Sequence, residues 1–490
     1  MATLTVNPMN QSPLSFPVKL SFGIGQFAEG LKNAAFGTLL IFYYNQVLGL
    51  PGTMAGIAVG IAVIVDAFTD PLAGSVSDHW HSRHGRRHPF MYASMVPLAI
   101  AFYFLFNPLV SGEWALFFWL LIFTNATRTA MSLYHVPHIA LGAEMTVDFS
   151  ERSELVGFRM FFSNFGVLFV FGAGFGYFFA ATPEFPNGQL NASVYPNFAA
   201  VVSVLMVITI FISAWGTRSV IPSLPSAPDI PRASALEVIQ RVFKDLFAAM
   251  KSKSFRWLFS GVLVVFIMVG VNTALDLYIF TYFWELEPGS VLYLIIAYPI
   301  GVMIGSFASP AFFRRWGKKA GLIFGGLAWP LWQVVPIALR LLGWFPENGD
   351  ALLLPLLIFI KFFQGACTVQ ANVAFGSMVA DVVDEYEYDT GKRQEGIFFA
   401  ASSFSAKATT GVGNVIAGFS LDIINWPRGA HIRTAADVPA ETIIDLGLVY
   451  GPLVAAFGFL SIWCYSHYKL TRERHEEILE SLNSQRASQG

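Results

Sequence analysis

Long apolar runs constrain the fold of this chain more than any other feature. A helix of about 20 consecutive apolar residues is long enough to cross the hydrocarbon core of a bilayer. Such runs recur from one end of the sequence to the other, at about 19–47, 52–77, 89–109, 114–142, 154–181, 195–217, 255–286, 290–313, 319–343, 351–378, 396–425 and 443–468. They predict an all-α integral membrane protein with twelve transmembrane helices in two six-helix bundles.

The amino-acid composition excludes most classes of soluble protein. Hydrophobic residues make up 55% of the chain and charged residues only 13%, with a mean hydropathy of +0.56. The net charge of −2 gives no indication of nucleic acid, because the basic residues are confined to loops. Cys367 and Cys464 both lie in apolar runs, so we expect reduced thiols and no structural metal. No pattern of nucleophile and base or of metal ligands predicts an enzyme or a cofactor.

The segments outside the runs predict the domain organisation. Residues 1–18 form a polar N-terminal segment without the charged start of a cleavable signal peptide. Residues 19–217 and 255–468 are the two bundles, and 469–490 is a tail. Between the bundles, 218–254 is a central loop whose second half (ALEVIQRVFKDLFAAMKSK) predicts an amphipathic helix at the membrane interface. Lys and Arg gather in this loop and after the even-numbered spans, which predicts an inner (plasma) membrane protein with both termini cytoplasmic.

The two halves repeat each other weakly. Arg315-Trp-Gly317-Lys318-Lys319 follows the second span of its half, as Arg83-His-Gly85-Arg86-Arg87 does in the first half. Met378-x-x-Asp381 likewise repeats Met145-x-x-Asp148. Parallel repeats of six helices are typical of the major facilitator architecture. The loop of the first half, with Asp78, Arg83, Gly85, Arg86 and Arg87, is a candidate gating motif.

Two acids, Asp66 and Asp70, lie inside the second span. They are four residues apart, so both carboxylates point to one side of the helix. Two carboxylates held close in a low dielectric cannot both ionise unless a cation lies between them. The pair is therefore a candidate site for Na⁺, Li⁺ or H⁺, with Thr69 as an additional oxygen ligand. A permanent salt bridge is the alternative, and the residues leave it open: its partner would be one of the intramembrane cations Arg128, Arg159 or Lys407.

The fourth and eleventh spans supply charges that can act on this pair. Arg128, Ser132 and His135 share one stripe of a helix. We favour Arg128 as the counter-ion of Glu29 or Asp66 over a role as substrate ligand, and leave His135 open. Lys407 lies about twelve residues into its span, deep enough to neutralise the aspartate pair from the other half until a cation releases it. A plain interhelical ion pair is the alternative.

Further polar side chains within the spans are candidates for the substrate cavity. Intramembrane polar and ionisable groups usually face a cavity or a partner. The full set of substrate-binding candidates is Glu29, Asn33, Arg128 and His135 in the first half and Asn272, Asp276, Gln364 and Thr368 in the second half.

Three ordered stretches resemble the glycoside–pentoside–hexuronide:cation symporters, the melibiose permease group of the major facilitator superfamily. They are DAFTDPLAGSVSD followed by RHGRRHP, YHVPHIALGAEMTVDFSERSELVGFR (134–159) and MVADVVDEYEYDTGKRQEGIFFAASSFSAK (378–407). The resemblance implies alternating access, with the coupling cation held at Asp66 and Asp70. It also implies a hydroxyl contribution from Ser132, a span 11 lysine at Lys407 and a span 5 arginine at Arg159.

The chain departs from melibiose permease at the sugar site. The acidic positions that hold sugar hydroxyls there correspond to Gly30 and His135 here, with Glu29 in place of a lysine. The string YHVPHIAL is also similar to the family's vertebrate lysolipid transporters. We therefore expect a cation-coupled symporter, using Na⁺ or H⁺, for a sugar, glycoside or uronide-like solute. The alternatives are a lysolipid or another anionic or zwitterionic substrate and, from another class, a passive facilitator or channel. The expected partners are the solute, the cation and the lipid bilayer, without nucleic acid, and the expected functional unit is a monomer.

Overall fold

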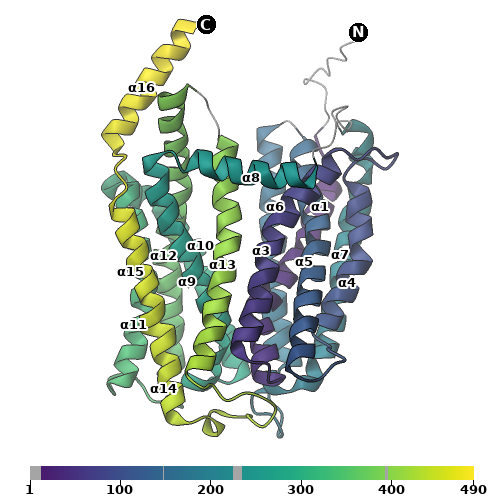
Figure 1. The fold of residues 1–490 in the computed structure, drawn as a ribbon, viewed down its shortest axis with the longest axis vertical. Coiled ribbons are helices and arrows are strands. Elements are labelled where there is room, and N and C mark those ends of the chain that lie inside the picture. The colour runs from purple at the N-terminus through teal and green to yellow at the C-terminus, as the bar shows by residue number, and fades with distance from the viewer. Residues whose placement is uncertain (1–12, 147, 225–233, 392–394, 490) are drawn as a thin grey trace.

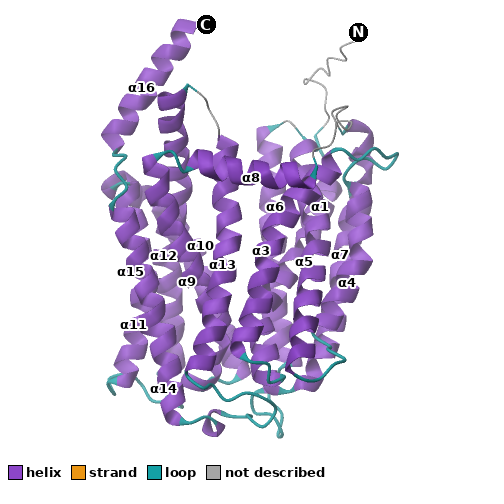
Figure 2. Ribbon diagram, viewed as in Figure 1, coloured by secondary structure: helices purple, strands orange, loops and turns teal. Residues whose placement is uncertain are grey.

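The computed structural model describes residues 13–146, 148–224, 234–391 and 395–489. Throughout these ranges the regular structure is helical, and no strand occurs in them (Figure 2). Most of the expected N-terminal segment 1–18 and residues 225–233 of the expected central loop lie outside the described residues.

The helices form two bundles that lie side by side (Figure 1). Several helices continue through a π-helical turn toward one end of the molecule. We call each membrane-spanning helix, with its π-helical turns, a rod, and each rod corresponds to one of the twelve apolar runs. The first bundle contains α1 (Phe16–Ala34) with α2 (Leu40–Phe42), α3 (Gly52–Asp78), α4 (His88–Leu105), α5 (Glu113–Glu144), α6 (Phe149–Ala173) and α7 (Tyr195–Gly216). The second bundle contains α9 (Lys253–Tyr278), α10 (Pro288–Trp316), α11 (Lys318–Leu341), α12 (Leu353–Thr390), α13 (Glu395–Ile423) and α14 (Ala440–Leu448) with α15 (Val454–Ser466).

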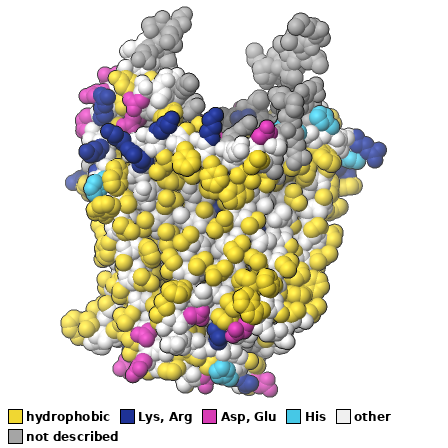
Figure 3. Space-filling model, in the orientation of Figure 1, with side chains coloured by type: hydrophobic (Ala, Val, Ile, Leu, Met, Phe, Trp, Pro, Cys, Tyr) yellow, Lys and Arg dark blue, Asp and Glu magenta, His cyan; other side chains and the backbone are white. Residues whose placement is uncertain are grey.

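The distribution of apolar and charged side chains on the outer surface is that expected for a protein in a lipid bilayer. Ten helices among the described residues are long and apolar enough to cross a membrane. The two rods that fall short of this criterion are built on α1 and α13. Large apolar side chains such as Phe307 and Trp463 are exposed on the sides, and charged side chains gather at the two ends (Figure 3). This distribution is that of a multi-pass membrane protein.

One end of the molecule is covered by a helix that joins the two bundles, and we call it the α8 end. α8 (Ala235–Ala249) begins with a capping box between Ser234 and Glu237 and lies across both bundles, in contact with α3 and α13 (Figure 1). Its Phe243 ring is 6.0 Å from that of Phe68 on α3 and 6.2 Å from that of Phe404 on α13. The structure thus confirms the helix that the sequence analysis predicted in the second half of the central loop.

The helices α3 and α13 carry the main contact between the bundles. Gly52 and Gly56 of α3 lie against the backbone of α13 at Gly418 and Asn414, and a Cβ at either glycine would overlap backbone oxygen atoms. Glycines spaced by four on one face allow two helix backbones to approach closely. Elsewhere the bundles meet where α9 contacts α2 and the π-helical turn Ala35–Leu39, and where α10 contacts the π-helical turn Gly174–Phe178 that follows α6.

Side-chain hydrogen bonds close the end opposite α8, which we call the distal end. The Tyr278 hydroxyl donates to Asn45 Oδ1 at 2.7 Å, and the Trp426 indole N–H donates to Gln46 Oε1 at 2.6 Å. Asp422 of α13 accepts the first two backbone N–H groups of α3, from Gly52 at 2.9 Å and Thr53 at 2.7 Å. Each bond joins one bundle to the other, so the distal end is closed.

The C-terminal tail, for which the sequence analysis predicted no secondary structure, is mostly helical. Residues Arg472–Gln489 form helix α16, which contacts α12. Ile478 and Leu482 of α16 are buried in an apolar cluster with Val382 and Val383 of α12. The sequence signal for this helix is weak because only these few apolar residues interrupt a strongly polar segment.

Candidate functional site

The two aspartates of α3 lie at the contact between the bundles, where a cation of the other bundle reaches them. Asp66 is buried, and its Oδ2 accepts hydrogen bonds from Lys407 Nζ at 3.0 Å and Arg128 at 3.2 Å. Asp70 is more exposed and forms a close ion pair with the same Lys407 ammonium. Lys407 of α13 therefore bridges both carboxylates from the opposite half.

Hydroxyl oxygens complete this cluster. The Ser132 hydroxyl of α5 donates to Asp66 Oδ1 at 3.1 Å. Thr69 donates to the backbone carbonyl of Asp66 at 3.2 Å, and its oxygen lies 3.5 Å from that of Ser132. Carboxylate, hydroxyl and carbonyl oxygens are thus collected around one buried point. Hard cations prefer such oxygen ligands.

The sequence analysis weighed two roles for Arg128, counter-ion and substrate ligand, and in the structure Arg128 is a counter-ion. It pairs with Asp66, and its guanidinium lies 5.2 Å from the centre of the Phe36 ring. Its Nε has no hydrogen-bond partner although it is buried. Arg159, in contrast, forms no ion pair within the described part of the chain, because α6 packs on α1 and not on α3. The suggested pairing of Arg159 with the aspartates is therefore wrong for this state.

A second charged group lies on α1 close to this cluster. Glu29 Oε1 accepts hydrogen bonds from Lys32 and Asn33, both at 3.1 Å, whereas its Oε2 is buried without a partner. The His135 ring lies within electrostatic reach of Glu29 and Asp70. The first-half substrate candidates are thus gathered near the aspartate pair.

The second-half candidates form a separate network. Asp276 Oδ1 accepts a hydrogen bond from Asn272 at 3.3 Å and a close one from the Tyr450 hydroxyl, which in turn lies 3.5 Å from Lys361 Nζ. Tyr450 was missed by the sequence analysis, since a tyrosine within an apolar run carries no distinguishing signal. Further along α12, Gln364 donates to the backbone of α11 at 3.3 Å, and the buried Thr368 hydroxyl has no partner.

The candidate gating motif is a closed ion-pair cluster at the α8 end of the first bundle. Arg87 contacts Asp78 and Glu144, each at 2.5 Å, and Arg86 pairs with Glu144 at 2.9 Å. Gly85 has a φ of +75°, which allows the tight turn between α3 and α4. The exposed Arg83 remains outside the cluster.

The equivalent turn of the second bundle has a similar form. Gly317 has a φ of +82°, and Lys318 pairs with Asp381 at 2.7 Å. The repeat inferred from the sequence thus has matching structures in the two halves.

A cavity of about 300 Å³ reaches the aspartate site from the α8 end. Asp70 and Lys407 line it together with Pro71 and Val136, and Asp245 and Leu246 of α8 line it from the α8 end. A solute that enters from this end therefore meets the ion pair between the two bundles.

Comparisons with known proteins identify related transporters. The chain is 23% identical to an isoprimeverose transporter of Lactiplantibacillus pentosus, over 94% of this chain and 90% of that protein. It is 24% identical to the putative glycoside/cation symporter YagG of Escherichia coli (strain K12), over 97% of both chains. The fold resembles that of the nucleoside transporter NupG, with a TM-score of 0.62 at 14% identity, covering 93% of this chain and 100% of that one.

The family assignment rests on a match along nearly the whole chain. Residues 21–472 match the model of the family described as MFS/sugar transport protein. The relatives and structural neighbours are transporters and not enzymes, and they include glycoside symporters, as the resemblance in sequence predicted. The chain therefore belongs to the MFS/sugar transport protein family, in its glycoside–pentoside–hexuronide group.

Proposed function

We propose that this protein is a secondary active symporter that couples a monovalent cation, Na⁺ or H⁺, to a sugar, glycoside or uronide-like solute. The observation that carries the proposal is the Lys407 ammonium of the second bundle, which bridges Asp66 and Asp70 of the first. A lysine in this position occupies the place that a coupling cation would take. Cation binding and the contact between the bundles are then linked directly.

Charge balance explains how the link operates. In the state described, two carboxylates face two cations, Arg128 and Lys407, and the cluster is neutral. A Na⁺ or H⁺ at the carboxylates makes the Lys407 ammonium redundant and releases it toward the cavity. The released ammonium then has hydrogen-bond donors for the oxygen atoms of a solute. Cation binding thus precedes solute binding.

The closed distal end and the cavity below α8 support alternating access. We propose that the α8 end is cytoplasmic, because the basic turns around Arg86 and Lys318 lie there. The described state is then the one in which solute exchanges with the cytoplasm. The membrane potential acts on the coupling cation with a driving force of about 2.3 kcal/mol per charge per 100 mV.

The solute is proposed to be rich in hydroxyl groups. Glu29, Asn33 and His135 offer both acceptors and donors on the first bundle, and Asn272 and Thr368 have buried polar atoms without partners on the second. The names of the isoprimeverose transporter and of the glycoside/cation symporter indicate sugar derivatives as the first class of solutes to test.

Uptake into proteoliposomes under an imposed Na⁺ or pH gradient tests the proposal. We expect wild-type protein to concentrate the solute against its gradient, by up to about 50-fold per 100 mV for one coupled charge. Asp66→Asn and Asp70→Asn proteins should lose this accumulation, whereas Asp389→Asn, which removes an exposed carboxylate at the α8 end, should retain it. Accumulation by correctly inserted Asp66→Asn and Asp70→Asn proteins would refute the coupling site. If wild-type protein only equilibrates the solute, with no effect of the Na⁺ or pH gradient, the protein is a passive facilitator.

A further inference from the structure

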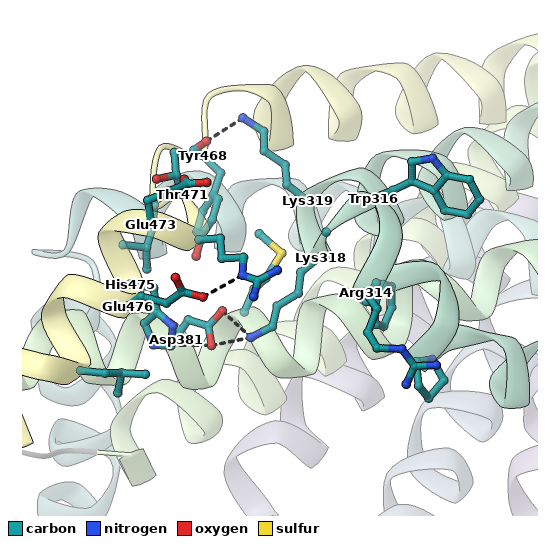
Figure 4. Close-up of a pocket in the computed structure, with 17 residues that line it drawn as sticks. Arg314, Trp316, Lys318, Lys319, Asp381, Tyr468, Thr471, Glu473, His475 and Glu476 are labelled. Carbon is teal, nitrogen blue, oxygen red and sulfur yellow. Dashed lines mark hydrogen bonds and ion pairs between the residues drawn. The ribbon is translucent and has the colours of Figure 1, made fainter.

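A second cavity lies away from the aspartate site. Its volume is about 610 Å³, and it lies at the α8 end of the second bundle, between the turn that joins α10 to α11, the end of α12 and the start of α16 (Figure 4). Pro310, Phe313 and Leu479 give it an apolar wall. The proposed transport cycle assigns no role to this cavity.

Most charged side chains that line the cavity lie on the side of α12 and α16, where His475 pairs with Asp384 at 3.1 Å and Glu473 adds a further carboxylate. Lys318 pairs with Asp381 at 2.7 Å, and Arg472 pairs with Glu476 at 2.8 Å, so these four charges neutralise one another within the protein. Figure 4 shows this paired set on the side of α12 and α16, whereas Arg314 lies across the cavity on α10.

Three cations near α10 retain hydrogen-bonding capacity. Arg314 is exposed and has no ion pair or hydrogen bond with another described residue, and Arg315 contacts only the ring of Trp316, at 5.3 Å. Lys319 donates to the backbone carbonyls of Ser466 and Tyr468, at 2.9 and 2.8 Å. An ammonium has three donors, so Lys319 keeps one for a ligand. The unused charge on this side is positive.

An apolar stripe leads from these cations along the side of the molecule. Met303, Phe307, Pro310 and Arg314 are spaced by four, three and four residues and therefore share one face of α10. Met303 and Phe307 are 65% and 85% exposed, on the surface that faces lipid. Trp316, 57% exposed at the end of the helix, has the position typical of aromatic residues at a membrane interface. A ligand with an anionic headgroup and apolar chains would fit both the cations and the apolar stripe.

The first bundle shows that the repeat alone does not create such a site. Its equivalent turn places Arg86 and Arg87 against Glu144, and Arg87 also against Asp78, which leaves Arg87 buried. Arg86 and Arg87 are thus used within the protein, and Arg83 of that turn is exposed outside the cluster. In the second bundle Lys319, which takes the position of Arg87, donates to backbone carbonyls instead of a carboxylate, and the exposed Arg314 takes the position of Ser82.

We propose that this cavity binds the headgroup of an anionic phospholipid from the leaflet on the α8 side, with Arg314 and Lys319 of the cavity wall and the neighbouring Arg315 supplying the positive charge, and the acyl chains along the Met303–Phe307 face. Basic pockets at the ends of transmembrane helices are suited to such headgroups. The lipid would connect α10 to the segment before α16. The proposal is independent of the transported solute and of the coupling cation.

Native mass spectrometry of the full-length protein in detergent tests the site. The probes are phosphatidylglycerol and phosphatidylethanolamine with the same acyl chains. We expect the wild type to prefer phosphatidylglycerol, and Arg314→Gln/Arg315→Gln to weaken its binding by about fivefold for each arginine removed. The control is Arg83→Gln/Lys251→Gln, which removes two exposed charges elsewhere at the α8 end and should keep the wild-type affinity. An unchanged affinity in the first variant, or an equal loss in both, would overturn the proposal.

Two further measurements separate a lipid from a free phosphate. Glycerophosphate at the same concentration should leave phosphatidylglycerol bound, and displacement would assign the cavity to a soluble phosphate compound instead. In vesicles, brominated phosphatidylglycerol should quench wild-type fluorescence more than that of Trp316→Phe, which removes one of twelve tryptophans. Equal quenching of the two proteins would contradict a lipid beside Trp316.

Discussion

Replacing Asp422 with alanine should loosen the distal end of the molecule. The Asp422 carboxylate of α13 accepts the N–H groups of Gly52 and Thr53, at 2.9 and 2.7 Å, although these residues begin α3 in the other bundle. The residue before them, Pro51, provides no side-chain cap. Asp422 therefore acts as an N-cap supplied by the opposite half, and it is available only while the distal end is closed.

The size of the effect follows from this geometry. Replacing an N-cap with alanine costs about 0.5–2 kcal/mol, and a negative charge at a helix N-terminus contributes about 0.3–1 kcal/mol. The Asp422 side chain is 31% exposed, so water replaces part of the lost interaction. We therefore expect a loss of about 1.5 kcal/mol in the closed state, which increases the ratio of open to closed distal ends about tenfold.

Distances between spin labels on the two bundles measure this ratio. Labels at Glu184 and Ala436, in exposed distal segments of the first and second bundle, would be attached in a background in which Cys367 and Cys464 are replaced. Asp422→Ala should enlarge the long-distance population, and Asp445→Ala, which removes an exposed carboxylate from the same end, should not. Identical distance distributions for Asp422→Ala and wild type would refute the reasoning.

Two other substitutions test the packing and the second network. Gly418→Val should prevent close contact of α3 and α13, because a Cβ at Gly418 would overlap the backbone oxygen of Gly52. The same labels should then report an open distal end, and an unchanged distribution would contradict the packing described. Tyr450→Phe removes the hydroxyl that links Asp276 and Lys361. Leaving a buried carboxylate short of a partner costs about 1–3 kcal/mol. For a chain of 490 residues the apparent Tm should then fall by about 1–3 °C, which thermal unfolding in detergent measures against Tyr388→Phe, an exposed tyrosine.

Apolar periodicity predicted the twelve rods because the bilayer sets their length and excludes irregular backbone. It also predicted that Asp66 and Asp70 share a face, since this depends only on a spacing of four residues in a helix. The choice of Arg128 and Lys407 as their partners depended on the high cost of unpaired charge within a membrane. Arg159 met the same criterion and still has no carboxylate partner among the described residues, because its helix packs elsewhere.

Contacts that belong to one conformational state could not be predicted in this way. The hydrogen bonds of Asp422 and Trp426 join segments more than 350 residues apart and exist only while the distal end is closed. A usable signal was present in the spacing of Gly52, Gly56 and Gly60, which indicates a close helix contact but does not identify its partner. Sequence periodicity predicts each helix separately, whereas the conformational state of a transporter depends on which helices are in contact.

The position of α8 has a consequence for the speed of transport. Asp245 and Leu246 of this helix line the cavity that contains Asp70 and Lys407, and Phe243 touches both bundles. Any solute that leaves by this route must pass the helix or wait until it shifts. The helix that joins the two halves therefore also slows the diffusion of the solute. Diffusion past α8 and the conformational change are consecutive steps, and the slower step limits the turnover rate.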